Sequence, residues 1–220
     1  MRRAVCGVAA CALAFLGGGS ARADLYDDAV AHAGRPAADL QRDATDHPAQ
    51  VLRLAGIQPG MVIADFLAAD GYYSELLRYV VGPHGHVYLL NDAAWDKWID
   101  NQWQERLLRL PNLEHRTIDM HHLGLPPHSL DGIVLLIDHS AKPGTGREAA
   151  GTLHRIDEEF ARRDFEKHGF VLVARSGVLR RPDDPRDMIT FRGEMVGKTD
   201  RFVMVFHRSA AKTVRARRRR

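Results

Sequence analysis

The chain has little cysteine, and it has no long hydrophobic run beyond its first residues. Its two cysteines, Cys6 and Cys11, both precede residue 24. The rest of the chain therefore offers no disulfide, no cysteine nucleophile and no thiolate metal site. A Walker phosphate-binding loop and a Gly-x-Ser-x-Gly nucleophile elbow are also lacking, which excludes the usual signatures of P-loop nucleotide hydrolases and α/β-hydrolases.

The amino-terminal segment has the pattern of a secretory signal peptide. Arg2 and Arg3 precede an apolar stretch over 4–16, and Ala21-Arg22-Ala23 fits an A-x-A cleavage site. The apolar stretch is shorter than the roughly 20 residues that a membrane-spanning helix needs. We therefore predict a signal peptide over 1–23, export to the periplasm, and no membrane span after the signal is removed.

The charges are unevenly distributed along the chain. There are 31 Lys and Arg against 28 Asp and Glu, and three of the basic residues precede residue 24. Residues 212–220 form a basic tail, and residues 24–211 form the expected domain, which is acidic. Like charges in a run repel one another, which favours a solvated, disordered tail over an arm that binds phosphate, membrane or the domain itself. No segment resembles a nucleic-acid-binding module, and we expect no nucleic-acid partner.

Short apolar segments alternate with amphipathic ones. Helices are expected at the start of the domain, after Pro36 and Pro48, and over 72–81, 93–110 and 152–168. Strands are expected over 61–66, 86–90, 113–118, 130–137, 170–178 and 201–207. Alternation of this kind indicates an α/β fold with a mostly parallel sheet and helices on both faces.

Acidic residues stand at the ends of the first four expected strands. They are Asp65, Asp92, Asp119 and Asp138. Ligands of open α/β sheets bind beyond the carboxyl ends of the strands. Carboxylates there can accept hydrogen bonds from ribose hydroxyls or an adenine amino group, or they can cap the helices that follow. Because four positions share this placement, we favour a binding crevice.

The order and spacing of these segments resemble class I S-adenosylmethionine-dependent methyltransferases. The phrases IQPGMVIADF, GYYSELL, DHSAKPGTG, TLHRID and GKTDRFVMVF are similar to a family of predicted methyltransferases among secreted bacterial proteins. The similarity runs from about Ala31 to His207. It implies a Rossmann-like methyltransferase fold, S-adenosylmethionine as cofactor, and methyl transfer to a small acceptor that it does not identify.

By this resemblance, the loop after the first strand wraps the methionine part of the cofactor. Asp92, with Asn91 as its rival, would bind the ribose, and Asp119 and Met120 would lie beside the adenine. The positions that the resemblance assigns to cofactor binding are Asp65, Gly71, Tyr72, Asn91, Asp92, Asp119 and Met120.

The glycine loop departs from the superfamily pattern, which is acidic-x-Gly-x-Gly-x-Gly. Asp65 and Gly71 match its ends, whereas Leu67 and Ala69 replace the first two glycines. Glycine adopts positive φ without steric cost, and other residues do not. We therefore expect Leu67 either to occupy space that the cofactor uses or to force a different turn.

The resemblance also predicts an internal deletion. A βαβ unit takes about 30 residues or more, but the corresponding segment over 129–143 is only 15 residues long. LDGIV is similar to the start of the fourth strand of the fold, and VLLIDHSAKPGTG to the end of the fifth. We therefore expect one central strand-helix unit to be missing.

His139, flanked by Asp138, is the candidate catalytic pair. An imidazole titrates near neutrality, and a general base is useful when the acceptor must lose a proton. The structural alternative is that both residues fix the loop that follows them. His115, His121, His122 and His128 lack the spacing of a metal site, so we predict none.

Two other functions compete with a methyltransferase. A non-catalytic periplasmic binding protein on the same scaffold would have no affinity for adenosyl ligands. A damaged gene product would fold poorly and expose apolar helix residues such as Trp98 and Leu107.

Overall fold

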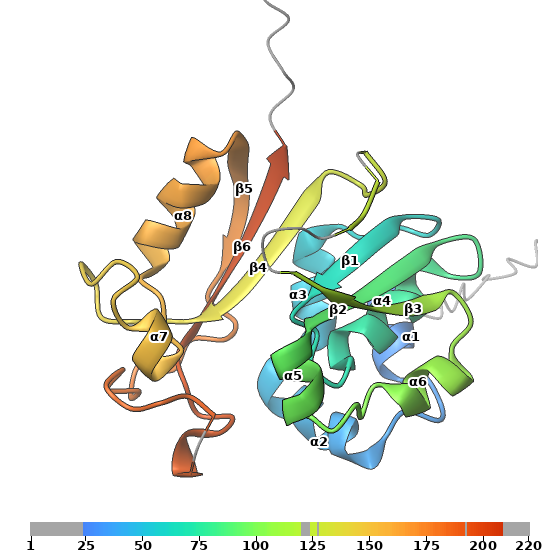
Figure 1. Cartoon of the computed structure of the whole chain (residues 1–220), viewed down its shortest axis with the longest axis horizontal. Coiled ribbons are helices and arrows are strands. Elements are labelled where there is room, and N and C mark those ends of the chain that lie inside the picture. Colours follow the sequence, from blue (N-terminus) through green and yellow to red (C-terminus); the bar gives the residue numbers. More distant parts are fainter. Residues whose placement is uncertain (1–23, 120–123, 127, 192, 209–220) are drawn as a thin grey trace, which may run out of the picture.

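The computed structural model describes residues 24–119, 124–126, 128–191 and 193–208. Two three-stranded sheets lie next to each other, with helices packed around them (Figure 1). The strands are β1 (Val62–Phe66), β2 (His86–Asp92), β3 (Leu113–Ile118), β4 (Ile133–His139), β5 (Phe170–Ser176) and β6 (Arg201–Arg208). The α-helices are α1 (Leu25–Val30), α2 (Ala37–Asp46), α3 (Pro48–Ala55), α4 (Tyr72–Val81), α5 (Ala93–Trp98), α6 (Gln104–Arg109), α7 (Ala150–Leu153) and α8 (Glu158–Lys167).

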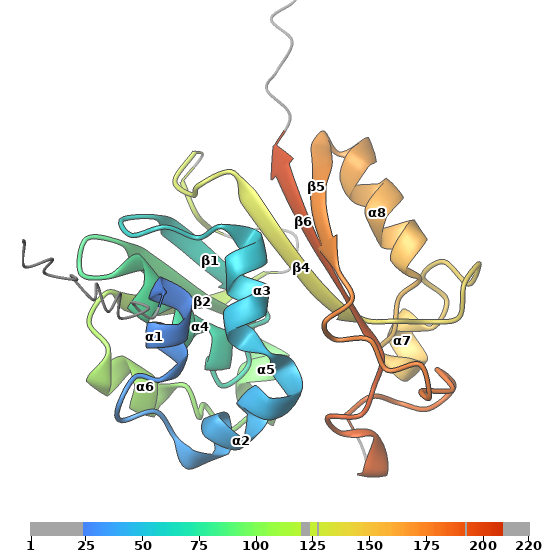
Figure 2. The same ribbon diagram turned by 180° about the vertical axis from the view of Figure 1, so that it is seen from behind.

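The first sheet is parallel, in the order β1-β2-β3. Its central strand β2 has Val87, Leu89 and Leu90 fully buried. Helix α4 packs against this sheet, and α1 packs against α4 (Figure 2). Helix α5 contacts β2 and β3, and α6 contacts β3. The sheet therefore places the carboxyl ends of three strands along one edge, as the sequence predicted.

The second sheet is antiparallel, in the order β4-β6-β5. Successive residues of β6 alternate between two layers. Phe202, Met204 and Phe206 pack with α8, whereas Val203 packs with α3. Residues of a strand point to opposite faces in turn, so this buried alternation places one helix on each face of the sheet. The parallel order is thus confined to the first sheet, because β6 runs against both of its neighbours.

The two sheets part between β1 and β4. Each of these strands is paired on one side only, β1 with β2 and β4 with β6. The segment before β4 meets β1 at Val62: the Asp131 N–H donates to the Val62 carbonyl at 3.1 Å, and the Val62 N–H donates to the Asp131 carboxylate at 2.8 Å. Every residue of β4 is only half-buried. One strand, β4, occupies the segment over 129–143.

The expected helix over 93–110 is broken in two, so that prediction was wrong. Asp100 and Asn101 both have left-handed backbone, with φ of 51° and 53°, and Asn101 donates its N–H to the Asp96 carbonyl. Left-handed residues end a helix, and Asp and Asn tolerate them better than most residues. Trp98, the last residue of α5, is 60 % exposed.

The expected helix over 152–168 is also broken. His154 has φ of 52° and separates α7 from α8. Asp157 caps α8, accepting the N–H groups of Glu159 at 2.8 Å and Phe160 at 3.2 Å. No helix within the described ranges is both long and apolar enough to cross a membrane.

Candidate functional site

The loop after β1 keeps the backbone geometry of a glycine-rich turn. Leu67, Ala69 and Gly71 have φ of 55°, 52° and 88°. These alternate residues are the three positions that the superfamily pattern gives to glycine. Leu67 adopts left-handed backbone, at a cost of about 1–2 kcal/mol for a non-glycine residue. Its side chain is 37 % exposed.

Within this loop, Gly71 is a position where a side chain would be crowded. A Cβ there would lie 2.7 Å from Leu89 Cδ1 and 3.1 Å from the Cδ of Arg106. The loop thus passes directly over β2 and the side chain of Arg106 before α4 begins.

Asn91 holds the middle of the loop. Its Oδ1 accepts the Ala69 N–H at 2.9 Å, and its Nδ2 donates to the Ala69 carbonyl at 3.0 Å. Nδ2 also donates to Asp96 Oδ1 at 3.0 Å. Asp96 is in turn bonded by Trp103, His115 and Thr117. Asn91, the rival of Asp92 in the sequence prediction, is the residue that reaches the loop.

Arg106 holds the end of the loop from α6. Its guanidinium donates to the Asp70 carbonyl at 2.7 Å and to the Asp70 carboxylate at 3.0 Å. It also pairs with Asp39 at 2.8 Å and with the buried Glu75. This buried guanidinium joins the loop to α2, α4 and α6.

The two acids predicted at the ends of β1 and β2 are each engaged by the helix that follows. Asp65 accepts the Ser74 hydroxyl at 2.6 Å, and burial raises its pKa to about 6. Asp92 accepts the Trp95 N–H at 2.7 Å as the N-cap of α5, which is the alternative that its position left open. Asp119 lies exposed at the end of β3, and Met120 lies outside the described residues.

A chain of polar contacts joins the loop to the second sheet. The Arg42 guanidinium lies 4.0 Å from the centre of the Tyr72 ring. Arg42 pairs with Asp46 at 2.7 Å, and Asp46 pairs with Arg201 at 2.8 Å. Arg201 is the register partner of His139. These contacts place Tyr72, the first residue after the loop, in the same polar layer as His139.

Asp138 and His139 are the last two residues of β4, and not the first two after it as predicted. The strand begins three residues later than expected and ends at His139. Asp138 accepts the His139 N–H at 2.6 Å, and His139 Nδ1 is bonded to the Thr199 hydroxyl at 2.7 Å. Burial raises the pKa of Asp138 to about 6. Burial, with Arg201 and Arg155 nearby, lowers the pKa of His139 to about 4.

The phrases TLHRID and GKTDRF contribute to a buried ionic cluster beside His139. Arg155, which is fully buried, donates to both carboxylate oxygens of Asp184, at 2.7 and 3.1 Å. Asp200 accepts from Arg180 at 3.1 Å and from Arg186 at 2.8 Å. The Ser140 N–H donates to the Asp200 carbonyl at 2.9 Å. In the fold these phrases thus fix the ends of β4 and β6.

Sequence reasoning missed several polar residues around the loop. They are Arg42, Asp46, Ser74, Asp96, Arg106, Thr199 and Arg201. Arg106 and Asp39 are 67 positions apart, and Arg201 and Asp46 are 155 apart. Periodicity gives no signal for such pairs. One sign of these polar residues is visible in the sequence: charged side chains interrupt the otherwise apolar face of the expected helix over 93–110.

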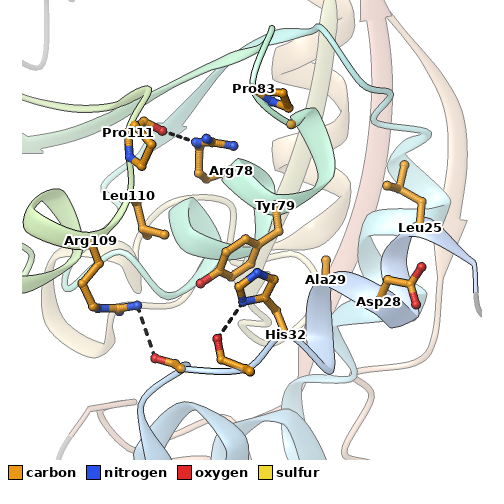
Figure 3. Close-up of a pocket in the computed structure, with 13 residues that line it drawn as sticks. Leu25, Asp28, Ala29, His32, Arg78, Tyr79, Pro83, Arg109, Leu110 and Pro111 are labelled. Carbon is orange, nitrogen blue, oxygen red and sulfur yellow. Dashed lines mark hydrogen bonds between the residues drawn. The ribbon is translucent and has the colours of Figure 1, made fainter.

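The larger of two described surface hollows lies at the other end of the sheet. A hollow of about 590 Å³ is lined by residues of α1 and the end of α4, and by Leu110 and Pro111 before β3 (Figure 3). It faces the amino ends of β2 and β3. A second hollow, of about 440 Å³, adjoins Asp70 and Arg106. Among the described residues no group of three His, Cys, Asp or Glu has the geometry of a metal site, and His121 and His122 lie outside those residues.

No protein-family model and no curated protein matches the chain. Solved structures do match. An S-adenosylmethionine-dependent methyltransferase from Aquifex aeolicus has a TM-score of 0.52 at 17 % identity, over 76 % of this chain and 97 % of that one. The [4+2]-cyclase SpnF has a TM-score of 0.52 at 13 % identity, over 79 % of this chain and 82 % of that one. The chain therefore has the Rossmann-like fold of the class I S-adenosylmethionine-dependent methyltransferases.

Proposed function

We propose that the carboxyl ends of β1, β2 and β3 bind S-adenosylmethionine and that the protein transfers its methyl group to a small acceptor. The observation that carries the proposal is the loop over 66–71. It keeps left-handed backbone at all three glycine positions, although Leu67 and Ala69 occupy two of them. Such strain persists only where the surrounding structure holds it, and it is concentrated at binding sites.

The backbone of the loop fits the cofactor more closely than the side chains at the site do. The loop offers the close approach that the methionine part of the cofactor needs. Asp92 keeps one carboxylate oxygen outside its helix-capping bond, and Asp119 is exposed at the next strand end. These two acids are the candidates for the ribose and the adenine. Leu67 adds an exposed side chain where the superfamily has none.

When bound, S-adenosylmethionine supplies an electrophilic methyl group. The contribution of this chain is to orient the reactants. His139 is neutral at pH 7, because its pKa is lowered to about 4. Thr199 engages Nδ1, so Nε2 is the nitrogen that could take a proton from an acceptor. A base this weak suits an acceptor that is readily deprotonated.

We also infer that the parting between β1 and β4 marks the place of a missing central strand. Strands of parallel sheets are normally covered on both faces. β1 is apolar, yet its residues are at most half-buried, and Phe66 is 46 % exposed. In this proposal the lost strand lay beside the loop over 66–71.

A non-catalytic binding protein on this scaffold is the second candidate. Two observations favour it: Asp65 is turned inward to Ser74, and Asp92 caps α5. On this view the acids stabilise the fold and bind no adenosine.

Calorimetric titration with S-adenosylmethionine and S-adenosylhomocysteine separates the two candidates. We expect binding to the unmodified protein and at least tenfold weaker binding by Asp92→Ser, because serine still caps a helix but has no carboxylate. Asp28→Ser, at an exposed acid of α1, is the control. Absence of heat at millimolar ligand would leave only the non-catalytic candidate.

In this proposal the protein is exported and binds its methyl acceptor outside the cytoplasm. The pattern of residues 1–23, which lie outside the described residues, supports export. Amino-terminal sequencing of the protein recovered from the periplasm should give Asp24 as the first residue.

A further inference from the structure

The loop over 66–71 has left-handed backbone at three positions, and only the last of them is a glycine. Two of its three left-handed residues carry side chains, and isolated residues of this kind would leave the left-handed region. Something outside the loop must therefore stabilise it. The Ala68 N–H donates to the Leu90 carbonyl of β2 at 3.2 Å. The side-chain contacts come from two residues of other elements, Asn91 of β2 and Arg106 of α6.

Asn91 is buried, and both polar atoms of its amide are engaged within the protein. It is 0 % exposed. Its amide oxygen accepts from the Ala69 N–H, and its two N–H groups are used by the Ala69 carbonyl and by Asp96 Oδ1. Both backbone groups of Ala69 are thus fixed by one side chain. Asp96, which is itself bonded by Trp103 and His115, holds that side chain in place.

Arg106 fixes the next residue in the same manner. Nε and Nη2 bond the carbonyl and the carboxylate of Asp70. Asp39 and Glu75 hold the guanidinium from the other side. Arg109 provides an internal comparison, because it pairs with the same Glu75 and makes no hydrogen bond to the loop.

We propose that Asn91 and Arg106 are positioning residues that compensate for the missing glycines of this loop. Asn91 holds the left-handed Ala69, and Arg106 holds Asp70, which lies between the left-handed Ala69 and Gly71. Their effect on a ligand rests on the proposed function, since the loop would contact S-adenosylmethionine. Their effect on the loop itself does not.

The hydrogen bonds from Asn91 and Arg106 to the loop are here called the clamp. The test combines removal of the clamp with glycine at residues 67 and 69. We would measure hydrogen exchange of the backbone amides over 66–71, and S-adenosylhomocysteine binding by calorimetry, for Asn91→Ala, Leu67→Gly/Ala69→Gly and the triple variant. Asn91→Ala should speed exchange of the Ala69 amide at least tenfold and weaken binding at least tenfold. In the glycine background the same substitution should weaken binding less than threefold, because the turn no longer depends on the clamp.

Arg106→Lys and Arg109→Lys form a matched pair that keeps the charge. The first should speed exchange at Asp70 and Gly71, and the second should leave it unchanged. Equal losses of binding on Asn91→Ala in both backgrounds would overturn the proposal, as would unchanged exchange at Ala69. If the unmodified protein binds no adenosyl ligand, the proposed function fails. The exchange measurements still show whether Asn91 and Arg106 hold the loop.

Discussion

At the scale of single residues, the backbone around the candidate site depends on a few positions with positive φ. Gly71 and Gly60 have nearly the same φ, 88° and 86°. They differ in surroundings, because a Cβ at Gly71 would meet Leu89 at 2.7 Å, whereas nothing lies within 4 Å at Gly60. Comparing substitutions at these two glycines therefore separates the cost of backbone strain from the cost of lacking space for a side chain.

Gly71→Ala should destabilise the protein more than Gly60→Ala. Both variants incur the left-handed cost of about 1–2 kcal/mol, and Gly71→Ala adds overpacking of about 1–3 kcal/mol. Urea denaturation measures both free energies of unfolding. Equal losses would mean that Leu89 and Arg106 move aside freely.

Asp138 and His139 should give opposite pH dependences of stability. The pKa of Asp138 is raised from 3.8 to about 6, so its contribution is present below about pH 4 and lost as the pH rises through 6. The pKa of His139 is lowered from 6.5 to about 4, so its contribution is present above pH 6.5 and lost as the pH falls through 4.

Asp138→Asn should therefore gain stability relative to the unmodified protein as the pH rises from 4 to 7. His139→Gln should gain it as the pH falls from 6.5 to 4. For each variant, the difference in free energy of unfolding from the unmodified protein should change by at most about 1.4 kcal/mol per pH unit. Denaturation curves at pH 4.5, 5.5 and 6.5 measure both, and lines parallel to that of the unmodified protein would contradict the assignment.

At the scale of elements, helix ends and breaks are set by caps and left-handed residues. Asp157 starts α8 and also accepts the Gly144 N–H at 2.5 Å, so one carboxylate fixes both the helix and the loop that follows β4. The loop over 141–146 is thereby tied to α8, on the side of the second sheet away from α3.

Asp157→Ala should cost about 1–2 kcal/mol, because the first turn of α8 loses its cap. Asp164→Ala is the control on the same helix, where the carboxylate is half exposed and its nearest partner, His168, lies at 3.7 Å. That change should stay within about 0.5 kcal/mol. Thermal unfolding followed by circular dichroism compares the two, and a silent Asp157→Ala would show that the cap is replaceable.

At the scale of the whole molecule, the two sheets behave as one folding unit because helices connect them. The apolar core around α4 and β2 includes Val205 of β6. The ion pair of Asp46 with Arg201 joins α2 to the second sheet, with only 4 % and 12 % of the two side chains exposed. We therefore expect a single cooperative unfolding transition despite the parting between β1 and β4.

Arg201→Met should lower the free energy of unfolding by about 2–3 kcal/mol, since it leaves the buried Asp46 with Arg42 alone. Arg53→Met removes an ion pair to Asp24 that is 41 % and 45 % exposed, and it should change stability by less than about 1 kcal/mol. Calorimetric melting distinguishes them. Two separate transitions in the unmodified protein would contradict the single unit.

The sequence by itself determined the elements whose signals are local. Helix α4 and strand β3 have the predicted bounds, and α3 begins at Pro48 as expected. Hydrophobic periodicity, proline and glycine act over a few residues, so no tertiary contact was needed to read them.

Only the tertiary structure decided which polar groups meet. It turned Asp65 to Ser74, gave Asn91 to the loop, brought Arg106 to Asp70 and placed Arg201 beside Asp46. It also broke two helices that periodicity had joined. The physical reason is that a buried charge or amide must find a partner wherever the fold supplies one, and that partner is rarely a neighbour in sequence.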